Sequence, residues 1–253
     1  MKKRLLLTTI PLVLGLIGCG DGTSSGGQDE IVGSIDLRSY FPIESTTKNY
    51  KVISKEIGGT EKEEDLTEEI LVDDSKIETK IFGVTDNILT VQDNRLVYTN
   101  VSADGNISTV LYRYVDVGGV IYSKDISEVE KIELNGEEIG EKSITGTKEC
   151  ILEEELNEFS KDSYIYNGNI IKIKCTNRAT VTTKIKDEYL GLSEYVNGTE
   201  DFVDIDYRYL LNGTGSIALI DSDCIPEGMK YPDDTVTNCP LEHLKYRYIY
   251  YLE

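Results

Sequence analysis

The sequence of 253 residues has no tryptophan and a single histidine, His243, and these shortages limit the chemistry open to the chain. A serine or threonine nucleophile needs an adjacent base, most often histidine, and a lone histidine is more typical of a structural residue. The sequence also has no G-x-S-x-G motif, no P-loop and no zinc-protease helix motif. We therefore expect a protein that is not an enzyme and that uses no cofactor.

One short motif matches a pattern found in enzymes. Residues 45–48, Ser-Thr-Thr-Lys, match the S-x-x-K pattern of serine–lysine enzymes such as penicillin-binding proteins. The S-D-N and K-T-G elements that accompany this pattern are missing from the chain, so we discard it.

Basic residues are scarce, with 26 lysines and arginines against 46 aspartates and glutamates. A surface this negative is repelled by nucleic-acid backbones and by anionic headgroups, so we expect no nucleic-acid partner and no domain lying flat on a membrane. The charge can serve solubility alone, or it can capture cations or a basic partner.

Long apolar runs are also missing beyond the first 18 residues. Lys2, Lys3 and Arg4 precede an apolar run from Leu5 to Ile17, which is too short for a membrane-spanning helix of about 20 residues. A basic segment, an apolar run and a small residue in this order are typical of a secretory signal peptide. We expect residues 1–18 to be that signal.

Leu16-Ile17-Gly18-Cys19 resembles the lipobox of bacterial lipoproteins. The resemblance implies cleavage before Cys19, a diacylglycerol thioether on its sulfur and an acyl chain such as palmitate on its amino group. Gly20 stands where an aspartate favours the inner membrane, which implies a lipid-anchored protein of the cell envelope, in the outer membrane rather than the inner one. The implied partners are the membrane, through the anchor, and an envelope protein.

Four further cysteines are expected to form disulfides in an oxidising compartment. We prefer the sequential pairing of Cys150 with Cys175 and of Cys224 with Cys239 among the three connectivities. A metal site is disfavoured because no pair has C-x-x-C spacing and only one histidine exists.

Residues 19–34 are rich in glycine and serine and predict a flexible tether, followed by one β-rich domain over 35–253. A boundary near 125–147 is an alternative to a polar hairpin there. Apolar and polar residues alternate with period two, which predicts antiparallel strands. Glycine-containing pairs such as Asn135-Gly136, Asn167-Gly168 and Asn212-Gly213 predict turns. The residues expected to share faces are Ile171, Ile173 and Cys175; Ala179, Val181, Thr183 and Ile185; and Val203, Ile205, Tyr207 and Tyr209.

The segment 149–159 fits either a helix or a strand, and we favour the strand. A hairpin that pairs 150–157 with 168–175 places Cys150 opposite Cys175, with Cys150, Leu152 and Leu156 on one face. The fold class that we predict is mainly β, as a large curved antiparallel sheet, open barrel or sandwich with little helix. Residues 209–221 are similar to the closing segment of β-rich envelope lipoproteins, which implies the same architecture.

Three candidate sites remain open. Tyr112 with Tyr114, and Tyr207 with Tyr209, can line a concave face that carries a lipid or another apolar ligand, or can belong to the core. The acidic positions are weak calcium candidates because no Ca²⁺-binding loop motif is present; they are Asp204, Asp206, Asp221 and Asp223. Asn106 lies in an N-x-S motif that resembles a bacterial glycosylation acceptor but also fits a turn. The sequence predicts a lipid-anchored envelope protein that acts as a non-enzymatic binding or structural module, or as a carrier of an apolar ligand.

Overall fold

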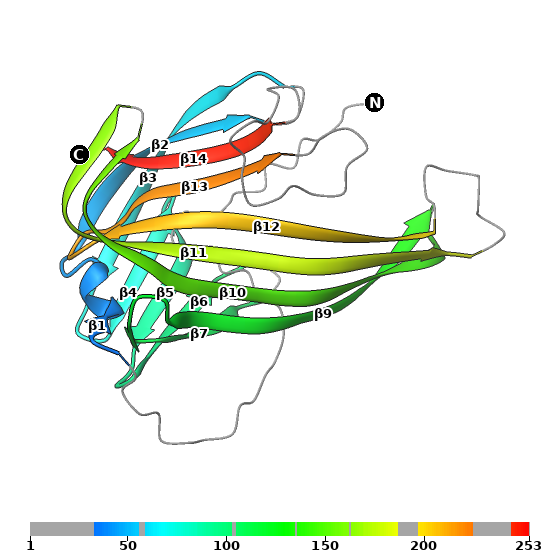
Figure 1. The fold of residues 1–253 in the computed structure, drawn as a ribbon, viewed down its shortest axis with the longest axis horizontal. Helices are drawn as coiled ribbons and strands as arrows, with labels where there is room; N and C mark the ends of the chain where they lie inside the picture. Colours follow the sequence, from blue (N-terminus) through cyan, green and yellow to red (C-terminus); the bar gives the residue numbers. More distant parts are fainter. Residues whose placement is uncertain are drawn as a thin grey trace.

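The computed structural model describes residues 33–55, 59–102, 105–134, 136–161, 163–186, 197–224 and 244–252. Within these ranges the chain is almost entirely β-strand, and its helical content is one 3-10 segment, η1, at Leu37–Tyr40. The predicted mainly β class with a large curved antiparallel sheet is confirmed (Figure 1). No helix among the described residues is long and apolar enough to cross a membrane. The predicted signal peptide and lipidated Cys19 lie outside these ranges.

Twelve strands form one antiparallel sheet built from two six-stranded meanders. The first comprises β2 (Thr46–Lys55), β3 (Lys62–Val72), β4 (Lys76–Ile81), β5 (Val84–Val91), β6 (Arg95–Asn100) and β7 (Ile107–Tyr112). The second comprises β9 (Val120–Leu134), β10 (Glu137–Lys161), β11 (Tyr164–Ile185), β12 (Gly198–Leu211), β13 (Gly215–Cys224) and β14 (Leu244–Leu252). The last strand, β14, pairs with β2, so the meanders join edge to edge. The short strands β1 (Ile35–Asp36) and β8 (Tyr114–Val115) form a separate pair.

The sheet curves into a nearly closed barrel. Its two edge strands, β7 and β9, approach each other without forming a ladder (Figure 1). The η1 segment covers the core at one end, where its Leu37 and Tyr40 are buried. Arg113 fastens this end by a bidentate contact with Asp36, with Nε–Oδ1 at 2.9 Å and Nη2–Oδ2 at 2.8 Å. One seam between β7 and β9 is therefore all that keeps the barrel from closing.

The burial of side chains alternates along β11 as the sequence predicts. Ala179 and Ile185 are buried, while Arg178 and Lys184, the residues just before them, are exposed. The expected turns at Gly136 and Gly213 are present, and both glycines have positive φ values of 86° and 69°. Glycine suits these positions because it adopts positive φ without a steric cost.

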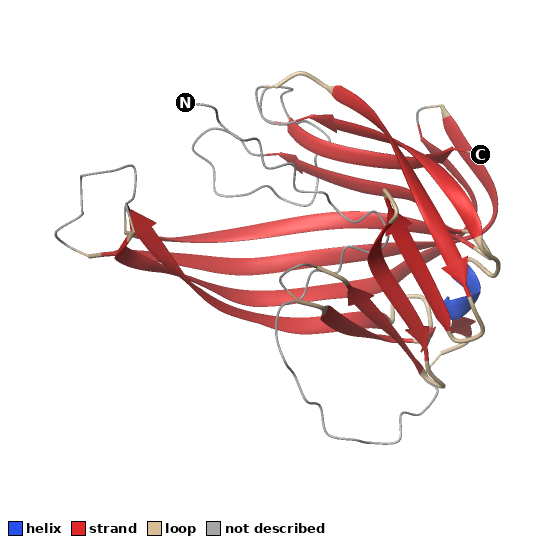
Figure 2. Ribbon diagram, turned by 180° about the vertical axis from the view of Figure 1, so that it is seen from behind, coloured by secondary structure: helices blue, strands red, loops and turns tan. Residues whose placement is uncertain are grey.

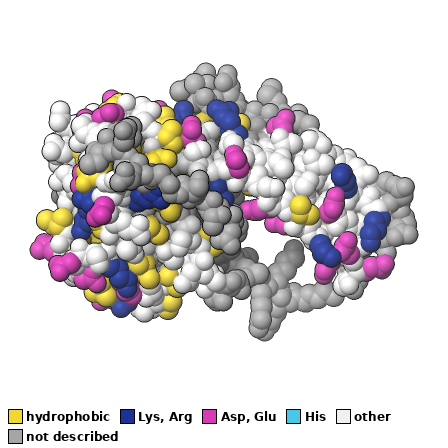
Figure 3. Space-filling view, turned by 90° about the horizontal axis from the view of Figure 1, so that it is seen from below, with side chains coloured by type: hydrophobic (Ala, Val, Ile, Leu, Met, Phe, Trp, Pro, Cys, Tyr) yellow, Lys and Arg dark blue, Asp and Glu magenta, His cyan; other side chains and the backbone are white. Residues whose placement is uncertain are grey.

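Strands β9 to β12 extend well beyond the barrel (Figures 1 and 2). Residues 125–147, a possible domain boundary by sequence, belong to β9, β10 and the turn between them. In Figure 3 the extended ends carry acidic and basic side chains side by side and few hydrophobic ones. Pairs such as Lys142–Glu130 (3.5 Å) and Lys184–Glu141 (3.6 Å) link neighbouring strands there. This part is therefore a mixed-charge sheet that adds little to the apolar core.

The favoured strand over 149–159 is confirmed, and so is the Cys150–Cys175 disulfide between directly paired residues of β10 and β11. Two bulges modify the predicted hairpin. One lies between Leu152 and Glu154, and the other lies opposite the step from Leu156 to Glu158. The expectation that Cys150, Leu152 and Leu156 share a face is wrong for Leu156. Because a bulge inserts a residue and reverses the alternation, Leu156 joins a different cluster from Leu152.

The predicted turn at Asn167-Gly168 is also wrong. The structure places both residues inside β11, and Gly168 has a φ of 134° at the second bulge. The hairpin turn lies between β10 and β11 instead, after Lys161 and before Tyr164. The sequence pattern located a positive-φ glycine correctly but assigned it to a turn, because a bulge needs the same backbone freedom.

The tip of the β10–β11 hairpin packs on the outer face of the second meander. Phe159 lies 4.3 Å from Tyr209 between ring centroids, and Tyr164 stacks on Tyr250 at 4.2 Å. The pair Tyr207 and Tyr209 is therefore part of this outer cluster rather than of a concave binding face. Tyr112 of the other predicted pair is half exposed. The barrel interior contains other tyrosines.

Candidate functional site

Charged residues occupy interior positions of the barrel. Lys48 and Tyr50 alternate with exposed neighbours on β2, and both are buried, at 2% and 1% exposure. Glu68 has the matching position on β3, where it pairs directly with Lys48 in the ladder and is fully buried. Two opposite charges therefore face the barrel interior from adjacent strands, where a barrel built for stability alone would hold apolar residues.

A cavity lies beside these residues. It holds about 30 Å³ for the centre of a water-sized sphere, and a single water needs about 10–15 Å³ by that measure. The wall combines apolar side chains from both meanders with a few polar ones. Its lining residues are Phe41, Pro42, Lys48, Tyr50, Ile70, Ile77, Thr79, Asn87, Leu89, Tyr98, Arg208, Leu210, Gly215, Ser216 and Leu219. The space suits a few waters or a small ligand, and it is too small for a lipid chain in this conformation.

Lys48 contacts two parts of the second meander. Its Nζ donates a hydrogen bond to the backbone carbonyl of Thr214, in the turn between β12 and β13, and lies 4.8 Å from the centroid of the Tyr251 ring. Burial disfavours the ammonium and lowers the pKa of Lys48 to about 8, although Glu68 acts in the opposite direction. The pKa of this buried lysine lies closer to neutral pH than that of an exposed lysine, so its protonation state changes more readily near neutral pH.

Glu68 is the least satisfied group in the interior. Neither of its carboxylate oxygens has a hydrogen bond of acceptable geometry, although the side chain is fully buried. Burial raises its pKa to about 7, while the nearby Tyr50 hydroxyl and Lys48 lower it and Asp86 raises it further. Removing both oxygens from water without partners costs more for the ionised form than for the acid. Glu68 is therefore partly protonated near neutral pH.

A bulge turns a third carboxylate toward this region. Asn87 pairs with Thr79 and Thr85 pairs with Lys80, so Asp86 is the extra residue on β5. Burial raises the pKa of Asp86 to about 6, and a hydrogen bond from the Asn87 amide to its carboxylate opposes that shift. Bulges often redirect a side chain in this way next to functional sites.

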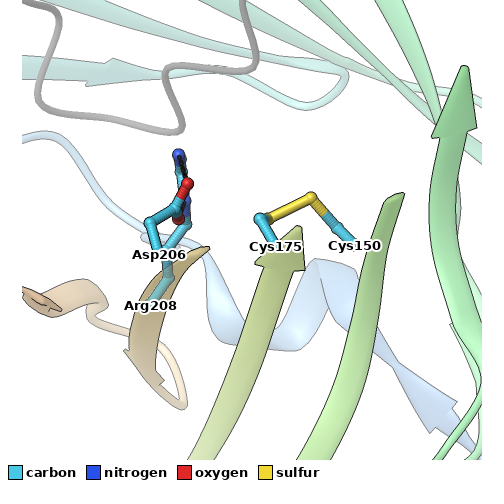
Figure 4. Close-up of a disulfide and its surroundings, with 4 residues drawn as sticks. All are labelled: Cys150, Cys175, Asp206 and Arg208. Carbon is cyan, nitrogen blue, oxygen red and sulfur yellow. Dashed lines mark hydrogen bonds and ion pairs between the residues drawn. A yellow bond between two sulfur atoms is a disulfide. The ribbon is translucent and has the colours of Figure 1, made fainter. Parts of the chain in front are cut away.

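Arg208 enters the cavity from β12. It is 6% exposed and its Nε lies 2.7 Å from Oδ1 of Asp206, with Nη2–Oδ2 at 3.4 Å (Figure 4). Burial disfavours the charged guanidinium, but Asp206, together with Tyr98 and Asp221, outweighs this effect and the pKa of Arg208 is raised. Asp206 pairs with Cys175 in the ladder, so the disulfide supports the strand that carries this ion pair.

The residues predicted from sequence have varied outcomes. Cys150 and Cys175 are joined as predicted. Cys19, Cys239 and His243 lie outside the described residues, so the second disulfide, from Cys224 to Cys239, stays a prediction.

The calcium candidates Asp204 and Asp206 lie on the inner face of β12, where Asp206 is bound to Arg208. In the described part of the chain, no group of three or more His, Cys, Asp or Glu side chains is placed to hold a metal ion. Asn106 is exposed just before β7, and its glycosylation stays a prediction.

The sequence reasoning missed Lys48 and Glu68, although a pattern for them exists. Lys48 takes the interior phase of a strand that continues with Tyr50 and Val52, and Glu68 lies two residues before the buried Ile70. A charged residue in the apolar phase of an alternating strand predicts a buried charge. Lys48 was considered only as part of the S-x-x-K motif, and Arg208 lacked such a pattern because the whole of β12 mixes charges with tyrosines.

The comparisons with other proteins add no relative. No protein-family model matches the chain, and neither a curated protein nor a solved structure matches it significantly.

Proposed function

We propose that this protein is a lipid-anchored, non-enzymatic binding module of the bacterial cell envelope, with its ligand site inside the barrel. The lipobox-like residues 16–19 support the anchor, and Gly20, in place of an aspartate after Cys19, supports an outer-membrane location. The Cys150–Cys175 disulfide supports export, because such bonds persist in oxidising compartments and are rare in the cytosol.

The observation that carries the binding role is the charged interior beside a cavity. Burying Lys48, Glu68 and Arg208 costs free energy that apolar residues of similar size would not. Side chains retained at such a cost, with shifted pKa values and next to a cavity, are characteristic of functional sites. The interior is therefore the part of the fold best suited to a ligand.

The binding role is tested with the full chain and a panel of small molecules of about three to six heavy atoms: aliphatic carboxylates, amines and alcohols. Ligand-observed NMR is expected to detect saturable binding of at least one class. Ser216→Leu fills the cavity and is expected to abolish that binding, whereas Ser108→Leu, at an exposed position of β7, is not. Binding of no class, or undiminished binding to Ser216→Leu, contradicts the proposal.

The anchor is tested separately by Cys19→Ser. We expect the wild-type protein to fractionate with envelope membranes and to carry an acylated N-terminal cysteine by mass spectrometry. The variant is expected to be exported without lipid and to be recovered in the soluble fraction. A variant that stays in the membrane fraction contradicts the anchor.

Carriage of a lipid or another apolar ligand is a second candidate, favoured by the seam between β7 and β9. These edges approach without a ladder, so the barrel has one side that can open without breaking strand pairing. Native mass spectrometry of the full chain extracted from envelopes distinguishes the two roles. A co-purified lipid of defined mass favours the carrier, and protein without lipid favours the small-ligand module.

A further inference from the structure

The charges on the cavity wall have one sign. Lys48 and Arg208 are the charged side chains that line the cavity, whereas the nearby carboxylates of Glu68 and Asp206 do not line it. In water-excluded surroundings a charged wall of one sign favours a ligand group of the opposite sign. The wall therefore favours an anionic group over an amine.

Both cations retain unused hydrogen-bond donors. Within the described residues Arg208 hydrogen-bonds to Asp206 alone, through Nε and Nη2, which leaves Nη1 without a protein acceptor. Lys48 has three N–H donors, and one of them is bonded to the Thr214 carbonyl. An arginine edge together with a lysine is a common arrangement for holding a carboxylate.

The remaining wall limits the body of the ligand. Apolar side chains dominate it, among them Ile70, Leu89, Leu210 and Leu219. The volume excludes long chains, and Asp206 already balances Arg208, so Lys48 provides the uncompensated positive charge when Glu68 is protonated. One uncompensated cation and a small apolar space fit a monoanion with a short body.

We infer that the interior cavity binds a small monocarboxylate with a short apolar body, its carboxylate held between Lys48 and Arg208. This inference rests on the proposed binding function and specifies its ligand class. Glu68 acts as a neutral neighbour in the complex, because its ionised form would repel the bound carboxylate. Binding is therefore coupled to a proton on Glu68 and weakens as Glu68 ionises, on passing through about pH 7.

The test is isothermal titration calorimetry of the full chain at pH 6 and pH 8 with acetate, propionate and butyrate, and with ethylamine and ethanol. Acetate, which matches the size of the cavity, is expected to bind at pH 6 with a dissociation constant of about 1 mM or tighter. The affinity for acetate is expected to fall by about fivefold or more at pH 8. In Glu68→Gln the contribution of Glu68 to this decrease is expected to disappear, and the decrease that remains reflects the deprotonation of Lys48, whose pKa is about 8.

Two lysine variants separate recognition from general charge. Lys48→Met removes the interior charge at similar volume and is expected to weaken acetate binding by about tenfold or more. Lys51→Met, three residues along on the outer face where Lys51 bonds Asp65 at 2.9 Å, is expected to change it less than twofold. Circular dichroism is the control that checks whether both variants fold.

The outcomes are distinct. Binding of ethylamine or ethanol but not of a carboxylate overturns the inference and leaves the binding function standing. An unchanged affinity in folded Lys48→Met, or an equal affinity at pH 6 and pH 8, also overturns it. Binding of no compound of the panel at either pH overturns the inference and the proposed function together.

Discussion

Glu68→Gln tests the buried carboxylate directly through the pH dependence of stability. The wild-type side chain is fully buried, and its pKa of about 7 compares with 4.5 for the unperturbed group. Between these two pH values the unfolded state loses its proton while the folded state keeps it. The free energy of unfolding therefore falls as pH rises from about 4.5 to about 7, and the decrease is complete above the folded pKa.

The magnitude follows from the shift. A change of about two and a half pH units at 1.36 kcal/mol per unit corresponds to about 3 kcal/mol. The substituted glutamine cannot ionise, so the stability of Glu68→Gln relative to the wild type is expected to rise by about that amount between pH 4.5 and pH 8. Part of the gain is offset, because the variant lacks the ionised carboxylate. That carboxylate raises the pKa of the buried Lys48 and so stabilises its ammonium form.

Urea denaturation followed by far-ultraviolet circular dichroism, repeated at half-unit pH steps, measures the effect. Glu69→Gln is the matched control, because Glu69 is the next residue on β3 and is exposed. Both variants keep the titratable groups that surround Glu68, which are Lys48, Tyr50, Asp86 and Tyr98. A constant stability difference between Glu68→Gln and the wild type across this pH range refutes the burial of an ionisable carboxylate with a raised pKa.

Three further changes test other parts of the fold by urea denaturation. Replacing Cys150 and Cys175 by alanine removes a crosslink over a loop of 25 residues in sequence separation and is expected to cost about 3 kcal/mol; a loss below 1 kcal/mol contradicts a constraining role. Phe82 has a φ of 52° and is 81% exposed at the β4–β5 turn. Because asparagine adopts positive φ more readily, Phe82→Asn is expected to raise the free energy of unfolding by about 1 kcal/mol. A decrease would show that Phe82 has packing partners. Tyr166→Phe removes the hydroxyl that donates to the Tyr251 carbonyl and is expected to cost about 1 kcal/mol; an unchanged stability contradicts that bond.

Much of the sheet could be predicted because its information is local. Alternation of period two identified the faces of β11 and β12, and equal offsets around one turn predicted the pairing of Cys150 with Cys175. The bulges were not predictable, because a residue such as Gly168 satisfies a turn and a bulge equally well. Leu156 was assigned to the wrong face for the same reason.

The interior site could not be predicted because it depends on long-range closure. Lys48 and Arg208 are 160 residues apart in the chain, and they line one cavity only because β14 joins the two meanders. Period-two patterns place each side chain on a face, but they do not show which faces meet across a barrel. The positions of Lys48 and Glu68 in apolar phases were visible in the sequence, whereas their common environment was not.

Chemical-shift mapping of the isotopically labelled full chain during an acetate titration at pH 6 tests whether the ligand site is inside the barrel. We expect perturbations concentrated on interior positions around Lys48, Tyr98 and Leu210, saturating together with the calorimetric binding. Perturbations confined to the outer cluster around Phe159 and Tyr209, or none at a concentration that saturates binding, would contradict it.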